Sequence, residues 1–261
     1  MKSLRESLLD DDLVDKTDKM IKDEINSFLK ENYKGIFKIS KTPNSDGKYE
    51  VSCLNDVVVK NTDIISLTNG LFTWGKVGGD FVCTICESLT SLEGAPKEVG
   101  GDFNCSYCYS LETLKGAPKE VGGSFYCSYC KSLTSLEGAP EKVGDYFDCY
   151  GCSYLKSLEG APEKVGGTFS CTNCDSLKTL KGAPEKVGGT FGCSICNSLK
   201  SLEGAPKEVA EDFYCSGCKS LTSLEGAPKK VGGNFDCSGC KIQFTKDDIK
   251  KVSNIKGEIK Y

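Results

Sequence analysis

The stretch Asp102-Phe103-Asn104-Cys105-Ser106-Tyr107-Cys108-Tyr109-Ser110-Leu111-Glu112-Thr113-Leu114 decides the fold of this chain. Its apolar framework stands at positions 103, 105, 108, 111 and 114, so a spacing of two opens into a spacing of three. A spacing of two is typical of a strand with one buried face, because successive side chains of a strand point to opposite sides. The later spacing of three indicates a chain that has left the strand and winds around a core.

This stretch belongs to an internal repeat. The unit Phe-x-Cys-x-x-Cys occurs eight times, every 22 residues, from Phe81 to Phe235. The connector between the units reads Ser-Leu-x-x-Leu-(Glu/Lys)-Gly-Ala-Pro-x-x-Val, and its Gly-Ala-Pro triplets begin at residues 94, 116, 138, 160, 182, 204 and 226. A fixed period of about 20 to 50 residues is the mark of a solenoid, in which each repeat buries its apolar side against its neighbours. The sequence therefore predicts one elongated array with a cap at each end.

The repeat resembles the leucine-rich-repeat consensus Leu-x-Leu-x-x-(Asn/Cys)-x-Leu. Phe103 and Cys105 match its inward strand positions, and Cys108 matches its Asn or Cys ladder. The resemblance covers residues 57–240 and is to the short bacterial type, also met in phages, in which a proline-containing segment replaces the convex helix. It implies a mainly β solenoid with a parallel sheet of about nine strands on one face and an irregular, extended convex side. Pro118 and its equivalents would lie on that convex side, since proline disfavours helix.

We expect three segments along the chain. Residues 1–56 form a small α/β cap, with a short helix over residues 3–9, a second helix from Asp15 or Thr17 to about residue 32, and a hairpin of residues 36–40 and 49–53. Residues 57–240 form the solenoid, and residues 57–67 are a degenerate first repeat ahead of the eight regular ones. Residues 241–261 form a C-terminal cap, whose helix over residues 245–255 covers the open end of the last repeat.

Composition disfavours several classes of function. The chain has no histidine, the commonest general base, and no nucleotide-binding or nucleophile motif, so we expect no enzyme. Its 33 basic and 37 acidic residues are interspersed without a basic stripe, which disfavours nucleic acid as a partner. No signal peptide and no membrane-length apolar stretch occur, so we expect no membrane partner and a cytoplasmic, reducing location, with a virion-associated location as the alternative.

Sixteen of the 17 cysteines form the Cys-x-x-Cys pairs, which stand at a zinc-ribbon spacing. A four-cysteine zinc site uses two pairs, so the sequence should then alternate over every two repeats, and it does not. We therefore expect structural thiols and no cofactor, with the second cysteine of each pair donating to a backbone turn. Zinc, an iron–sulfur cluster and redox catalysis are the alternatives. Cys53, outside the array, is expected to be the most exposed thiol.

Three columns of residues vary most between the copies: those before the phenylalanine, between phenylalanine and cysteine, and between the two cysteines. On an in-register solenoid they would share one outward, concave face, rich in the residue types that recognition surfaces favour. Tyr107, Tyr126 and Tyr129 should form one aromatic patch there, with Tyr126 and Tyr129 on the same strand. The expected binding residues are Asp102, Asn104, Tyr107, Tyr126, Tyr129, Tyr146, Asp148, Asn173, Tyr214 and Asp236.

These columns favour a non-enzymatic recognition scaffold that binds a protein or another surface macromolecule. A structural or assembly role is the first alternative: a virion or surface component that forms homo-oligomers or filaments. A metal-binding Cys-x-x-Cys array is the second. The Lys and Glu residues of the connectors are expected to form a solvated rim without a function of their own.

Overall fold

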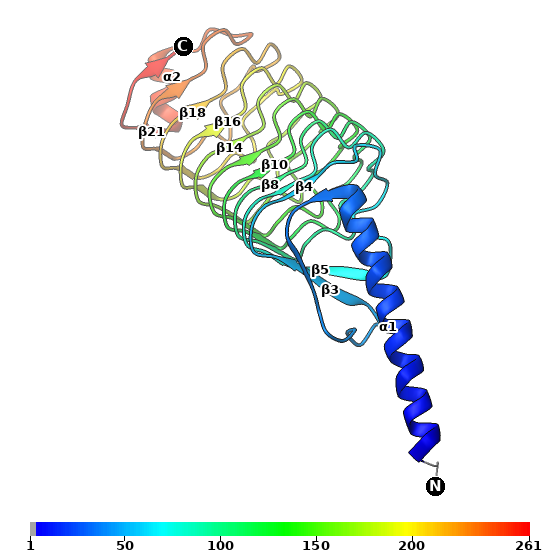
Figure 1. The fold of residues 1–261 in the computed structure, drawn as a ribbon. Helices are drawn as coiled ribbons and strands as arrows, with labels where there is room; N and C mark the ends of the chain where they lie inside the picture. Colours follow the sequence, from blue (N-terminus) through cyan, green and yellow to red (C-terminus); the bar gives the residue numbers. More distant parts are fainter. Residues whose placement is uncertain (1–3) are drawn as a thin grey trace.

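The computed structural model describes residues 4–261 and is a β-solenoid of about 10 turns (Figure 1). Each regular turn contributes one short strand to each of two sheets, and both sheets contain 11 strands. The predicted mainly β solenoid is confirmed. The connectors, expected to be irregular, instead form the second sheet, because each connector valine pairs in register with the valine of the next turn, as Val121 does with Val143.

Sheet A carries the Phe-x dipeptides and places each phenylalanine directly beside the next, as Phe103 beside Phe125. Only β1 is antiparallel to its neighbour among the pairs of this sheet in the described chain. The strands, in spatial order, are β1 (Tyr33–Lys34), β4 (Val57–Val59), β6 (Phe81–Val82), β8 (Phe103–Asn104), β10 (Phe125–Tyr126), β12 (Phe147–Asp148), β14 (Phe169–Ser170), β16 (Phe191–Gly192), β18 (Phe213–Tyr214), β20 (Phe235–Asp236) and β22 (Ile259–Lys260).

Sheet B begins with the predicted hairpin, β2 antiparallel to β3, and continues as parallel strands. In the regular strands a Lys or Glu that is exposed, or half-buried in the case of Glu208, precedes a buried valine, the alternation of a sheet with one face in the core. The strands, in spatial order, are β2 (Phe37–Ile39), β3 (Tyr49–Cys53), β5 (Phe72–Val77), β7 (Glu98–Val99), β9 (Glu120–Val121), β11 (Lys142–Val143), β13 (Lys164–Val165), β15 (Lys186–Val187), β17 (Glu208–Val209), β19 (Lys230–Val231) and β21 (Asn254–Ile255).

The phenylalanines of sheet A form a continuous stack through the core. From Phe81 to Phe235 each ring is fully buried, and neighbouring centroids are 5.0 to 5.7 Å apart. Full burial of one such side chain contributes about 1.5 to 3 kcal/mol. At the N-terminal end Trp74 meets Phe81 edge-on at 5.6 Å, and its indole N–H donates to the carbonyl of Leu67 at 3.0 Å. Trp74 therefore ends the stack without leaving a buried donor unpaired.

The terminal segments differ in part from expectation. The N-terminal helices are one helix, α1 (Leu4–Asn32), and residue 3 of the expected first helix lies outside the described residues. This helix projects from the solenoid, and its last turns pack on the body through Ile25 and Leu29 (Figure 1). Helix α2 (Lys246–Val252) is capped by Thr245 as expected but ends before residue 255, because residues 254–255 join sheet B as β21. Within residues 4–261, neither helix has the length and apolar character of a membrane span.

Both sheets continue beyond residues 57–240: β21 and β22 add a further turn from the C-terminal segment, and β1, β2 and β3 add strands from the N-terminal one. The degenerate repeat is in register with the regular ones, since Val57 pairs with Phe81. The segment boundaries themselves stay a prediction.

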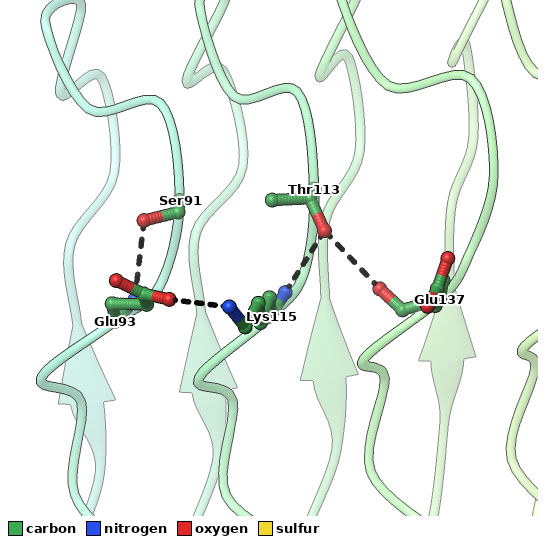
Figure 2. Close-up of polar contacts among 5 residues, drawn as sticks. All are labelled: Ser91, Glu93, Thr113, Lys115 and Glu137. Carbon is green, nitrogen blue, oxygen red and sulfur yellow. Dashed lines mark hydrogen bonds and ion pairs between the residues drawn. The ribbon is translucent and has the colours of Figure 1, made fainter.

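The rim after each leucine pair is held by local hydrogen bonds (Figure 2). The Ser91 hydroxyl accepts from the N–H of Glu93 at 3.4 Å, and Thr113 accepts from Lys115 at 3.2 Å. Thr113 also donates to the Glu137 carbonyl in the next turn, and Lys115 pairs with Glu93 of the preceding turn at 2.9 Å. These contacts tie successive turns together at the surface.

The Gly-Gly corner between the two sheets is glycine because of close approach and not because of positive φ. A Cβ at Gly123 would overlap Oδ1 of Asp102 in the preceding turn. The same clash, with the Asp that precedes the sheet A strand of the preceding turn, faces Gly79, Gly101 and Gly233. The two copies without this glycine, Asp145 and Glu211, follow turns in which Ser124 or Thr190 replaces the aspartate. Glycine is thus required where the preceding turn carries the aspartate.

This pairing predicts a specific energetic coupling. Gly123→Asp should destabilise the protein by about 2 kcal/mol, since it places a side chain on Asp102. In an Asp102→Ser background, which reproduces the natural Ser124 and Asp145 pair, the cost should fall by about 1 kcal/mol or more. Denaturant unfolding of the four variants in the cycle measures this coupling, and additive costs would show that the corner does not depend on the aspartate.

Candidate functional site

The column before each phenylalanine is largely engaged with its own backbone. Asp102 accepts from the N–H of Ser124 at 2.7 Å, and Asp212 accepts from Asn234 at 2.6 Å. Asp102, a predicted binding residue, is half-buried and holds the next turn in place. Tyr146 of this column differs from these residues, since it is 43% exposed.

The column between phenylalanine and cysteine is also partly engaged. Asn104 accepts from the N–H of Ser106 at 3.0 Å, Asp148 from Tyr150 at 2.9 Å, and Asp236 from Ser238 at 2.9 Å. All three are half-buried and stabilise the turn that follows the strand. Tyr126 lies half-buried on β10. Tyr214 donates its hydroxyl to Asp212, a bond that raises the pKa of Tyr214.

The third column, between the cysteines, does not lie on a strand. Each regular strand of sheet A ends before the first cysteine of its turn. The second of the two residues between the cysteines has a left-handed backbone. Three copies place glycine there: Gly151, Gly217 and Gly239. The others hold larger residues at φ of 58° to 63°: Ile85, Tyr107, Tyr129, Asn173 and Ile195. The prediction that Tyr126 and Tyr129 share a strand is therefore wrong.

Four tyrosines meet at this turn, and we call Tyr107, Tyr109, Tyr129 and Tyr150 the tyrosine cluster. Tyr107 and Tyr129 stack at 5.0 Å with an interplanar angle of 17°. Tyr109 meets Tyr107 edge-on at 6.5 Å, and Tyr150 meets Tyr129 edge-on at 5.2 Å. A hydrogen bond with Tyr150 raises the pKa of Tyr129. The cluster spans three consecutive turns of the solenoid.

The predicted aromatic patch is thus correct for Tyr107 and Tyr129. Tyr126 makes no ring contact with them in the described chain, and Asn173 lies two turns beyond Tyr129 in the same column. Sequence reasoning missed Tyr109 and Tyr150, which flank cysteines in columns otherwise filled mostly by small or charged residues. A usable signal was present, because 7 of the 11 tyrosines lie within residues 107–154: Tyr107, Tyr109, Tyr126, Tyr129, Tyr146, Tyr150 and Tyr154.

The surroundings of the cluster fit it closely. A Cβ at Gly151 would come within 2.8 Å of the Tyr129 ring, so glycine in that copy makes room for the tyrosine of the preceding turn. Lys131 lies 5.3 Å from the centre of the Tyr109 ring and adds a cation to the edge of the cluster. Tyr107 and Tyr109 are each 42% exposed. The cluster therefore presents aromatic surface to solvent.

The two largest grooves that we describe lie elsewhere, over the outer face of sheet B. One has a volume of about 990 Å³ and runs from Lys76 to Gly166; the other has about 700 Å³ and runs from Glu163 to Lys256. Lys and Glu side chains line both grooves together with valine, glycine and alanine residues of the connectors. The charged connector residues, expected to form a solvated rim, thus border a hollowed face.

The cysteines form two ladders inside the solenoid. From Cys108 onward, the second thiol of each pair donates to the carbonyl of the first cysteine one turn earlier, as Cys108 to Cys83 at 3.1 Å and Cys130 to Cys105 at 3.3 Å. Cys86, in the first pair, donates to the carbonyl of Thr84 instead. All 17 cysteines are free, and the half-buried Cys240 is the most accessible. The prediction that Cys53 is the most exposed thiol is wrong. Cys53 is only 2% exposed, because it lies on the inward side of β3.

The metal alternative has no geometric support in the described chain. Among residues 14–261, whose side chains the structure describes, no three Cys, Asp or Glu side chains are grouped as metal ligands. Burial raises the thiol pKa well above its ordinary value in five of the first cysteines of the pairs: Cys83, Cys105, Cys171, Cys193 and Cys215. Such thiols stay protonated and react poorly. That the protein binds no metal stays a prediction.

No protein-family model matches this chain, and comparisons with curated proteins and with solved structures found no match. The resemblance to leucine-rich repeats therefore stays a prediction.

The buried thiols predict a loss of stability in alkali. A thiol whose pKa is raised by folding stabilises the native state below its unfolded pKa, and this stabilisation is lost as the pH rises above it. Under reducing conditions the free energy of unfolding should fall above pH ~8.5, by about 1 kcal/mol per pH unit for each such thiol. Denaturant titrations at several pH values measure this, and thiolate absorbance should appear only on unfolding. Stability independent of pH to about pH 10 would mean that the thiols are not buried.

The left-handed turn predicts that Tyr107 is dispensable for folding. Tyr107→Gly should change the free energy of unfolding by less than about 1 kcal/mol, because relief of left-handed strain offsets the lost ring stack. The matched control is Tyr107→Ala, which loses the stack but keeps the strained backbone and should be the less stable of the two. Thermal unfolding compares them, and Ala equal to or more stable than Gly would contradict the turn geometry.

Proposed function

We propose that this chain is a non-enzymatic recognition scaffold that binds a protein partner through the tyrosine cluster. The observation that carries the proposal is the stack of Tyr107 on Tyr129 at left-handed positions. Ile85, Asn173 and Ile195 share this backbone conformation, and three other copies have glycine there, but only the two tyrosines form a stacked aromatic pair. A non-glycine residue in this conformation costs about 1 to 2 kcal/mol. Backbone strain that folding does not need is a pointer to function.

The chemistry of the cluster supports a protein partner. Tyrosine offers a large, rigid contact area with a polar hydroxyl at low cost in rotamer entropy, and a few such residues dominate most interfaces. The exposed ring of Tyr109 lies beside Lys131, and Tyr107, equally exposed, meets Tyr109 edge-on. Tyr146 and Tyr154, 43% and 61% exposed, come from the adjoining turn and extend the aromatic character of this region. A protein surface can use such a patch through apolar contact at its centre and hydrogen bonds at its rim.

The remaining functional expectations support the same proposal. The mixed charge and the absence of histidine from the sequence argue against nucleic acid and catalysis. The buried free thiols are consistent with a reducing, cytoplasmic location, with virion association as the alternative. A bacterial or phage origin and membership of the leucine-rich-repeat family rest on the repeat pattern alone.

Affinity capture with matched variants tests the proposal. The full chain is immobilised as wild type, as Tyr107→Gly with Tyr129→Gly, and as Ile195→Gly, which changes the same turn position in a distant repeat. We expect a partner that the wild type and Ile195→Gly retain and the tyrosine double variant loses. With the purified partner, the loss at the better single position should be about 2 kcal/mol. Equal binding by all three proteins would contradict the assignment of the cluster.

A further inference from the structure

The outer face of sheet B carries two columns of exposed charges. The two residues before each buried valine supply them: Lys97-Glu98, Lys119-Glu120, Glu141-Lys142, Glu163-Lys164, Glu185-Lys186, Lys207-Glu208 and Lys229-Lys230. We call this surface the charge face. The order of the two residues is Lys-Glu in the first two turns, Glu-Lys in the next three, and Lys-Glu again in the sixth. The seventh turn has two lysines. Like charges therefore stand beside each other within each block, as Lys142 beside Lys164.

Ion pairs on the charge face form where the order reverses and also in the last turn, where Lys230 pairs with Glu208 at 3.1 Å. At the first reversal Lys142 pairs with Glu120, and Lys119 pairs with Glu141 at 3.7 Å. At the second, Lys186 pairs with Glu208 at 3.1 Å, and Lys207 pairs with Glu185. β13 lies between the strands of Lys142 and Lys186. Each of these two lysines pairs with a carboxylate in its other neighbouring turn, and not with a residue of β13.

Glu163 and Lys164 at β13 are left without an ion pair in the described chain. Both are exposed, and Lys164 is the residue at which the two grooves over sheet B meet. The core places no demand on their order, because only Val165 of this strand is buried. Exchanging the two signs would give each side chain opposite charges in both neighbouring turns. The present order therefore leaves both charges between like charges of their own column in the described chain.

We propose that the charge face binds a second copy of this chain, face to face and in register, about a twofold axis parallel to the solenoid axis. Such a rotation places each turn opposite the same turn of the second copy. The first column of one copy then faces the second column of the other. Glu163 then faces Lys164 of the second copy, and Lys164 faces Glu163 of the second copy. Six of the seven levels place Lys against Glu in this way, with Lys229-Lys230 the exception.

The same pattern excludes the opposite polarity. A twofold axis along the strands would reverse the order of the turns and keep each column opposite itself. Because the first column reads Lys, Lys, Glu, Glu, Glu, Lys, Lys, it would then face its own reversed and identical pattern, with like charges at every level. Charge complementarity across the face thus selects parallel copies.

The size of the face predicts a weak dimer. Seven strands at about 4.8 Å cover roughly 30 Å along the axis, so the contact is on the order of 500 Å² per copy, below the roughly 800 Å² of a stable complex. Sheet A and the tyrosine cluster would stay free on both copies. The dimer would thus display two tyrosine clusters and raise avidity for a repetitive partner.

Sedimentation equilibrium of the full chain tests this proposal through charge reversal. We expect a dimer of the wild type at about 0.01 M salt that dissociates toward 1 M salt. E163K and K164E should each raise the dimer dissociation constant about tenfold or more, because the twofold axis makes each substitution act twice. An equimolar mixture of the two variants, and the double variant E163K/K164E, should recover dimerisation.

The controls separate association from folding. Each single substitution places a charge between two opposite ones in its own column, so the melting temperature of either variant should equal or exceed that of the wild type. E137K replaces a Glu by a Lys, as E163K does, but at a position away from the charge face. This control variant should dimerise like the wild type. A wild type that stays monomeric at millimolar concentration in low salt overturns the proposal, as do single variants that dimerise normally or a mixture that does not recover. These outcomes are independent of binding at the tyrosine cluster.

Discussion

The in-register stacking of one phenylalanine per turn is the interaction on which the rest of the structure depends. Ring centroids 5.0 to 5.7 Å apart match the spacing of parallel strands, so stack and ladder reinforce each other along sheet A. Every regular turn must then have the same length, and every position lies beside its equivalents in the neighbouring turns. The thiol ladders, the aspartate ladder and the valine ladder follow from that alignment, as do the tyrosine cluster and the charge columns.

Much of this architecture could be predicted from the sequence, because the repeat and its apolar spacing report directly on burial. The phenylalanine column, the inward cysteines, the hairpin and the Thr245 cap were all evident. The second sheet was not, since a single valine beside a charged residue is too short a signal for a strand. The ends of the sheet A strands were also missed: the left-handed turn is masked wherever Ile, Tyr or Asn replaces glycine.

The candidate site shows the same limit. Variability between copies marked Asp102, Asn104, Asp148 and Asp236 as free for binding, yet their carboxylates and amides cap backbone N–H groups. Short polar side chains that replace one another between the repeat copies can all accept from a nearby backbone N–H. Variation among such residues is therefore no sign of recognition. Aromatic side chains that gather at a partly exposed turn are more informative, because backbone capping does not explain them. This distinction separates Tyr107 and Tyr129 from the rest of the predicted set.

Site-specific photo-crosslinking to the captured partner tests the central claim, recognition through the tyrosine cluster, most directly. Lys131 beside Tyr109 and Lys219 four turns later occupy the same position of the repeat and are both exposed. A benzophenone side chain at position 131 should crosslink the partner, whereas one at position 219 should not. Crosslinking of equal yield at both positions, or at position 219 alone, would contradict the account.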